Sequence, residues 1–155
     1  MDLYPKTLTE ILFFSLFFLS SVNNVAIASS EAKESYVQGA MHFENKKYND
    51  AIEHLENAIK LEPENAAYQH LLAVSYGREA ENANWFRAVD LAQRTLIHLQ
   101  IASELDRNNV EILDDLMDYY REAPGFLGGD AKKADEIESL IEKINKNEVE
   151  STKIE

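Results

Sequence analysis

No cysteine occurs among the 155 residues of this chain, so no disulfide framework can stabilise it. Runs of basic residues are also lacking, because Lys and Arg never follow one another for more than two positions. The formal net charge at pH 7 is −13. Nucleic-acid binding depends on a basic surface that releases counterions, and docking on anionic lipids requires the same sign of charge. The sequence therefore excludes nucleic acid and argues against anionic membranes as partners.

Motifs for catalysis or metal binding are missing as well. Four histidines are spread over residues 42–98 without an HExxH pattern, so they offer too few convergent ligands for zinc. The glycine-rich stretch GFLGGDAKK at residues 125–133 matches neither GxxxxGK[ST] nor GxGxxG. It does place backbone N–H groups beside Lys132 and Lys133, which leaves an anion or small-molecule binder as a minor alternative. We expect no enzyme, no metal and no cofactor.

The long apolar run of this sequence lies near the N-terminus, in ILFFSLFFL at residues 11–19. The tripeptide AIA at residues 26–28 then supplies the small-x-small pattern that signal peptidase cleaves. The run is shorter than the roughly 20 residues needed to span a bilayer. We predict a secretory signal at residues 1–28, an exported periplasmic or secreted protein, and no stable membrane insertion after cleavage. A retained anchor is the alternative, because Lys6 is the only basic side chain in this segment.

Residues 32–65, AKESYVQGAMHFENKKYNDAIEHLENAIKLEPEN, form one complete unit of two amphipathic helices. The small residues Gly39, Ala51 and Ala58 stand where two helices must approach each other closely. Pro63 ends the second helix because proline cannot extend it. This pattern resembles the tetratricopeptide repeat. The resemblance implies an all-α, right-handed helical-hairpin solenoid whose concave groove is lined by the first helix of each unit.

A second unit spans residues 66–109 and is ten residues longer than the first, 44 against 34. The apolar stripe that begins at Trp85 predicts a second helix extended to about Asp106. Because Trp85 continues this stripe, we expect it and Phe86 to pack against the third unit. An exposed binding surface is the alternative, since tryptophan is enriched at interfaces.

A third unit at residues 110–144 completes a repeat domain over residues 29–144. Its turn is enlarged to PGFLGGD, in which glycines permit a positive φ and Asp130 can cap the next helix. Together with the long middle helix, this turn resembles those of a subset of exported bacterial tetratricopeptide proteins. The apolar period is lost after residue 144, which predicts a disordered acidic tail over residues 145–155.

The resemblance also indicates which side chains line the groove. One end of it is aromatic and apolar, and the other is acidic, because carboxylates spaced by three or four residues share a helix face. Convergent negative potential attracts basic ligands, although a solvated face without a partner is the alternative. The Lys, Asn and Arg clamp with which some family members hold acidic tails is missing. The predicted groove residues are Tyr36, Phe43, His70, Arg78, Glu111, Asp114, Asp118 and Arg121.

The sequence thus predicts a non-catalytic, exported interaction module, an adaptor or assembly factor that binds a protein or peptide with a basic segment. A structural homo-oligomer is the main alternative. Solenoids normally end in a capping helix with a polar outer face, and none follows Ile144. The uncapped apolar stripe of the last helix would then support a weak homodimer.

Overall fold

The computed structural model describes residues 27–151, and this part of the chain is helical throughout, without a strand. The predicted signal segment at residues 1–28 lies outside the described residues except for its last two positions. None of the helices within residues 27–151 is both long enough and apolar enough to cross a bilayer. The helices are an N-terminal helix (residues 27–44), α2 (Tyr48–Leu61), α3 (Ala66–Ala80), α4 (Trp85–Leu105), α5 (Val110–Glu122) and α6 (Ala131–Ser151), with a 3₁₀ turn, η1 (Gly125–Leu127).

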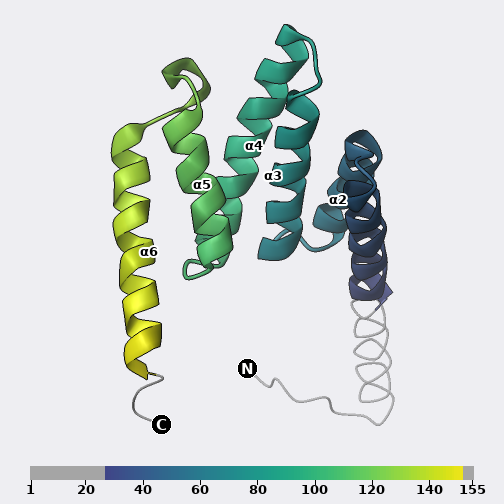
Figure 1. The fold of residues 1–155 in the computed structure, drawn as a ribbon. Coiled ribbons are helices and arrows are strands. Elements are labelled where there is room, and N and C mark those ends of the chain that lie inside the picture. Colours follow the sequence, from purple (N-terminus) through teal and green to yellow (C-terminus); the bar gives the residue numbers. More distant parts are fainter. Residues whose placement is uncertain (1–26, 152–155) are drawn as a thin grey trace, which may run out of the picture.

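The helices stand side by side in a curved row, in the order in which they occur in the chain (Figure 1). Contacts run from α2 to α3, from α3 to α4, from α4 to α5 and from α5 to α6. Each helix therefore buries its apolar face against its sequence neighbours, as stacked repeats do. The predicted all-α solenoid of helical hairpins is confirmed.

Asparagine side chains start three of these helices. Asn65, Asn84 and Asn109 each precede a helix and accept a hydrogen bond from the backbone N–H three residues further on, over 3.2–3.3 Å. Such a cap satisfies one of the N–H groups that the first turn of a helix leaves without a partner. The first residues of α3, α4 and α5 are thus determined by a capping asparagine that precedes each apolar stripe.

Small residues set the spacing in the first unit, as the sequence predicts. Ala51 and Ala58 are completely buried. A Cβ atom added to Gly39 would lie 2.7 Å from Cγ of Leu55, which is closer than packed side chains approach. The N-terminal helix can therefore lie directly on α2 because residue 39 has no side chain.

The second unit departs from this regular pattern through its long second helix. α4 has 21 residues, whereas α2 has 14, and the prediction of an extended helix from Trp85 is confirmed. Together with the end of α3 it forms the most projecting part of the row (Figure 1). The prediction that Trp85 and Phe86 pack was wrong, because Trp85 is 66% and Phe86 86% exposed. The stripe of α4 begins to be buried only at Leu91, one and a half turns later.

The enlarged turn between α5 and α6 is built as the sequence predicts. Gly128 has a φ of 96°, in the left-handed region that favours glycine. A Cβ atom on Gly129 would lie 1.7 Å from the carbonyl oxygen of Ala123, so this position excludes any side chain. Asp130 then accepts hydrogen bonds from the N–H groups of Lys132 and Lys133 at the start of α6.

The predicted end of the domain at residue 144 was wrong. α6 continues to Ser151, so residues 145–151 are helical, and only residues 152–155 of the expected tail lie outside the description. Helix-forming residues and an ion pair between Lys146 and Glu150, four positions apart at 4.0 Å, favour this extension. Loss of an apolar stripe removes packing, but it does not by itself end a helix.

Candidate functional site

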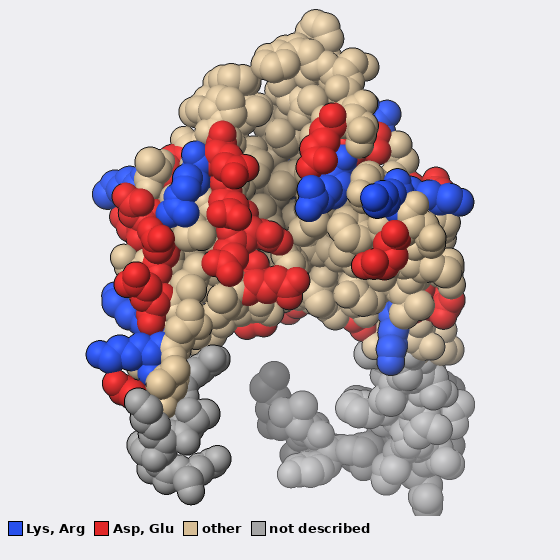
Figure 2. Space-filling view, viewed as in Figure 1, with Lys and Arg blue, Asp and Glu red and all other residues tan. Residues whose placement is uncertain are grey.

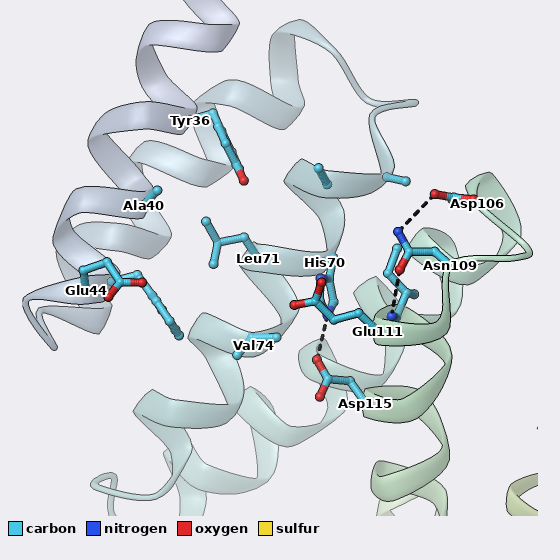
Figure 3. Close-up of a pocket in the computed structure, with 14 residues that line it drawn as sticks. Tyr36, Ala40, Glu44, His70, Leu71, Val74, Asp106, Asn109, Glu111 and Asp115 are labelled. Carbon is cyan, nitrogen blue, oxygen red and sulfur yellow. Dashed lines mark hydrogen bonds and ion pairs between the residues drawn. The ribbon is translucent and has the colours of Figure 1, made fainter. Parts of the chain in front are cut away.

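A groove of about 440 Å³ lies on one side of the row, with α3 as its floor and the N-terminal helix and α5 as its walls (Figure 3). The N-terminal helix contributes Tyr36, Ala40, Phe43 and Glu44 to its lining, and α3 contributes His70, Leu71 and Val74. The far wall comes from the start of α5 and the turn before it, with Asp106, Asn109, Glu111, Ile112 and Asp115. First helices of successive units thus line the groove, as the repeat pattern predicts.

The wall formed by the N-terminal helix is apolar and aromatic. The ring of Tyr36 stacks on that of Tyr68 with centroids 4.7 Å apart, and Phe43 lies 5.6 Å from Tyr48. These contacts hold Tyr36 against α3 and Phe43 against the start of α2. A ligand side chain in this half of the groove would therefore meet preorganised ring surface.

The opposite wall is acidic. Asp106, Glu111 and Asp115 line this wall, and Glu44 adds a fourth carboxylate from the last residue of the N-terminal helix. No Lys or Arg among the described residues lines the groove. Figure 2 shows the carboxylates as a continuous band along α5 on the face that the groove opens to. Like charges that converge on a concave surface raise the local negative potential.

His70 joins the floor of the groove to this acidic wall. Its Nε2 atom lies 2.6 Å from Oδ2 of Asp115, across the boundary between the second and third units (Figure 3). The His70 side chain is only 13% exposed, whereas that of Asp115 is 45% exposed. The pair fixes the position of α5 relative to α3 and leaves much of the Asp115 carboxylate facing the groove.

A smaller hollow of about 200 Å³ continues the groove towards the projecting end of the molecule. It shares Val74 and Asp115 with the first and adds Arg78, Glu81, Asp118 and Glu122. Arg78 is held by Glu81, with Nη1 3.0 Å from Oε1. The positive charge of Arg78 is thus paired with the carboxylate of Glu81, directly after α3. The carboxylates on the α5 side keep the hollow negative.

The predicted groove residues divide into three sets. Tyr36, Phe43, His70 and Glu111 line the larger hollow, and Arg78 and Asp118 line the smaller one. Asp114 and Arg121 line neither. With 3.6 residues per turn, these two lie roughly 60–80° round α5 from Glu111, on the side towards α6. Arg121 accordingly bonds to Glu138 of α6, with Nη2 3.1 Å from Oε2.

Several lining residues lie outside the predicted set. Glu44 and Asp106 lie at helix ends, next to turns, where no periodic pattern assigns a face. Asp115 stands four residues after Glu111 and could have been placed on the same face from that spacing. Asp114 stands three residues after Glu111, a spacing that also fits one helix face, yet it lines neither hollow.

Two titratable side chains lie between α3 and α4. Burial lowers the pKa of His98, whose Nδ1 is 2.6 Å from Oε1 of Gln69. Burial and a hydrogen bond to Glu56 raise the pKa of Tyr76 to about 12. Neither residue lines the groove, and both belong to the packing of helices. Burial also raises the pKa of Tyr119, which lines the smaller hollow and whose hydroxyl is turned to the backbone carbonyls of Ala92 and Leu127.

The glycine-rich turn does not offer the free N–H groups that an anion site requires. Gly128 N–H donates to the carbonyl of Gly125, and Gly129 N–H donates to that of Pro124. The Asp130 carboxylate occupies the start of α6, where an anion would have to bind. Within residues 27–151, no group of three or more His, Asp or Glu side chains is arranged to hold a metal ion.

Comparison with known proteins agrees with the architecture. A family model described as TPR repeat matches residues 39–79, which include α2 and nearly all of α3. No curated protein matches the chain. The resemblance deduced from Gly39, Ala51 and Ala58 is thus confirmed over residues 39–79, which cover most of the first unit and the first helix of the second.

Proposed function

We propose that the groove binds a peptide segment rich in Lys or Arg, on the basis of the match of residues 39–79 to a family model described as TPR repeat. Repeats of this family are in general protein-interaction scaffolds without catalytic activity. The observation that carries the proposal is the composition of the groove. Its larger hollow has four carboxylates and, among the described residues, no Lys or Arg.

The shape of the groove supports a segment that carries both charge and an apolar side chain. The wall with Tyr36 and Phe43 offers ring surface, and the wall with Glu111 and Asp115 offers carboxylates. Arg and Lys side chains can satisfy carboxylates by charge-assisted hydrogen bonds while their stems lie on apolar surface. A ligand that meets both walls at once would be held in one orientation.

A binding titration with labelled peptides tests the proposal. The probe is a fluorescent peptide of alternating Lys and Arg around one central Tyr, and an acidic peptide with the same Tyr serves as its counterpart. Wild-type protein should bind the basic peptide, more weakly at higher salt, and should not bind the acidic one. The Glu111→Gln, Asp118→Asn variant should raise Kd roughly tenfold, because each lost charge pair is worth on the order of 0.5–1 kcal/mol.

The matched control is Glu53→Gln, Glu142→Gln, which removes the same charge from exposed positions outside both hollows. It should change Kd by less than about twofold, since distant exposed charges are screened. Equal weakening by both variants would show that net charge, and not the groove, attracts the peptide. Equal binding of basic and acidic peptides would overturn the proposal.

Export is part of the same proposal and rests on the sequence of residues 1–28. The apolar run at residues 11–19 and the tripeptide at residues 26–28 support a periplasmic or secreted adaptor or assembly factor. N-terminal sequencing of the mature protein from the envelope fraction should begin at Ser29. A retained Met1 in that fraction would indicate an uncleaved anchor instead.

One observation favours a weak homodimer as a second candidate. On the side of the row where α6 meets α4 and α5, a hollow of about 490 Å³ is lined in part by Leu116, Ile137 and Leu140. Leu140 is partly exposed at the edge of α6. Light scattering should then detect a dimer at high concentration that Leu140→Glu abolishes, and a strict monomer would exclude it.

A further inference from the structure

Three aromatic side chains project together from the end of the molecule where α4 begins. Trp85 and Phe86 come from the first turn of α4, and Phe126 comes from η1 in the turn before α6. Trp85 is 66%, Phe86 86% and Phe126 64% exposed. The rings of Trp85 and Phe126 lie 6.2 Å apart between centroids. We call this group the aromatic tip.

The backbone beneath the aromatic tip is held in place. The single hydroxyl proton of Tyr119 is shared between two acceptors, the carbonyl of Ala92 in α4 at 2.8 Å and that of Leu127 at 3.0 Å. Leu127 N–H in turn donates to the carbonyl of Pro124. These bonds tie the turn that carries Phe126 to the helix that carries Trp85. The rings are therefore presented by two connected turns, with little ordering left to occur on binding.

None of the three side chains of the aromatic tip is charged, although the protein as a whole carries −13, and Arg87 in the same turn of α4 is paired with Glu79 over 3.3 Å. Figure 2 shows no Lys, Arg, Asp or Glu over the projecting end on this face, while acidic residues crowd the face below it. The polar group that the three aromatic side chains offer is the indole N–H of Trp85. Aromatic rings with one polar handle are enriched where hydrocarbon meets water at a membrane surface.

The size and shape of the tip decide between possible occupants. Side chains of this type bury about 150–250 Å² each, so the exposed part of all three amounts to roughly 300–550 Å². A stable protein interface needs about 800 Å² from each partner, which excludes a second copy held by this surface alone. The tip also lies at the projecting end of the row (Figure 1), and its three rings line none of the hollows described above. A bilayer surface accepts a small projecting wedge without a matching pocket.

We propose that the aromatic tip inserts into the interfacial region of an electrically neutral lipid bilayer. The acidic face behind it sets the lipid preference, because an anionic membrane repels negative charge within about a Debye length, 8–10 Å at ordinary ionic strength. Attachment by three side chains is peripheral and reversible. It would orient the row of helices with α4 towards the membrane and leave the groove open to water.

Trp85 is the only tryptophan of the chain, so its fluorescence reports on the tip alone. The full-length protein is titrated with phosphatidylcholine vesicles. Its emission should shift to the blue, and phosphatidylcholine brominated near the head of the acyl chain should quench it. Adding 30% phosphatidylserine should reduce the response at least twofold. The apolar run at residues 11–19 contains no tryptophan, so any binding through that run leaves this signal unchanged unless the tip itself inserts.

Variants of the neighbouring rings complete the test. Phe86→Ala, Phe126→Ala keeps the Trp85 reporter and should raise the lipid concentration for half-maximal shift at least tenfold. Ile97→Ala removes a 52% exposed apolar side chain from the same helix, and it should have no effect. Both variants should keep the wild-type helix content, since the replaced side chains are exposed.

Three outcomes would overturn the proposal. If the Trp85 emission stays at its aqueous maximum when phosphatidylcholine vesicles are added, the tip does not enter neutral bilayers. An equal response in both variants places the effect elsewhere on the surface. A response that grows with phosphatidylserine means that electrostatic attraction, and not ring insertion, brings the protein to the membrane.

Discussion

Nε2 of His70 and Oδ2 of Asp115 lie 2.6 Å apart and join the second repeat unit to the third across the floor of the groove. The two residues are 45 positions apart in the chain, so their contact exists only when the units are stacked. It therefore reports on the geometry of the groove as well as on stability.

Removing this contact should destabilise the fold. Asp115→Ala leaves a mostly buried His70 without its partner, and we expect the free energy of unfolding to fall by about 1–3 kcal/mol. Asp114→Ala, at the adjacent exposed position, is the matched control and should change it by less than about 0.5 kcal/mol. Urea unfolding followed by circular dichroism measures both. Equal effects would show that the bond contributes nothing beyond the helix itself.

Three glycines of one turn offer a graded test of backbone packing. Gly129→Ala would place a Cβ atom 1.7 Å from the Ala123 carbonyl oxygen, so the turn must open and stability should fall by about 2–4 kcal/mol. Gly128→Ala should cost about 1–2 kcal/mol, because residue 128 has a φ of 96°. Gly125→Ala meets no atom within 4 Å and should be close to neutral. Thermal unfolding should rank the variants in this order, and a destabilised Gly125→Ala would contradict the described turn.

The packing of the first unit depends on Leu55. This side chain is fully buried against Gly39, and Leu55→Ala should lower the free energy of unfolding by about 2–5 kcal/mol through lost burial and the cavity it leaves. Val37→Ala, on the neighbouring helix but half exposed, should cost less than about 1 kcal/mol. Denaturant midpoints compare the two. A similar loss for both would mean that α2 does not pack as described.

His98 should make the fold less stable in mild acid. Burial lowers its pKa in the folded protein, whereas the unfolded chain has the ordinary value near 6.5. Below about pH 6.5 the unfolded chain therefore binds a proton that the folded protein does not. The free energy of unfolding accordingly decreases as the pH is lowered. This contribution is fully present above pH 7.5 and is lost progressively as the pH falls.

The comparison of wild type with His98→Gln isolates this effect from the many carboxylates that titrate at lower pH. Between pH 7.5 and pH 5.5 the variant should lose less stability than wild type, as measured by urea unfolding at each pH. A proton NMR titration of His98 should have its midpoint below 6.5. A midpoint above 6.5 would reverse the sign and contradict the burial.

Residues with a periodic or turn-specific role allowed the fold to be deduced from the sequence. Gly39, Ala51, Pro63 and Asp130 all have the places in the structure that simple sterics and hydrogen bonding assign to them. The length of α4 followed from an apolar stripe in the same way. The prediction from the sequence failed at Trp85, which continues the apolar stripe of α4 but stays 66% exposed because its ring neighbour, Phe126 of η1, is itself 64% exposed.

The groove was deduced less completely, for a geometric reason. Helical spacing tells which residues share a face, but not which face the next helix will cover. Helical spacing alone assigned Asp114 and Arg121 to the groove. In the structure both lie on the side of α5 that faces α6, where Arg121 donates a hydrogen bond to Glu138. Residues at helix ends, such as Glu44 and Asp106, belong to no stripe and become lining residues only when the units are stacked.

The order of helix contacts has a kinetic consequence. Every major contact in the row joins helices that follow one another in the chain, so no long loop must close before native packing begins. Chains of such low contact order fold in microseconds to milliseconds, and folding can start in more than one unit.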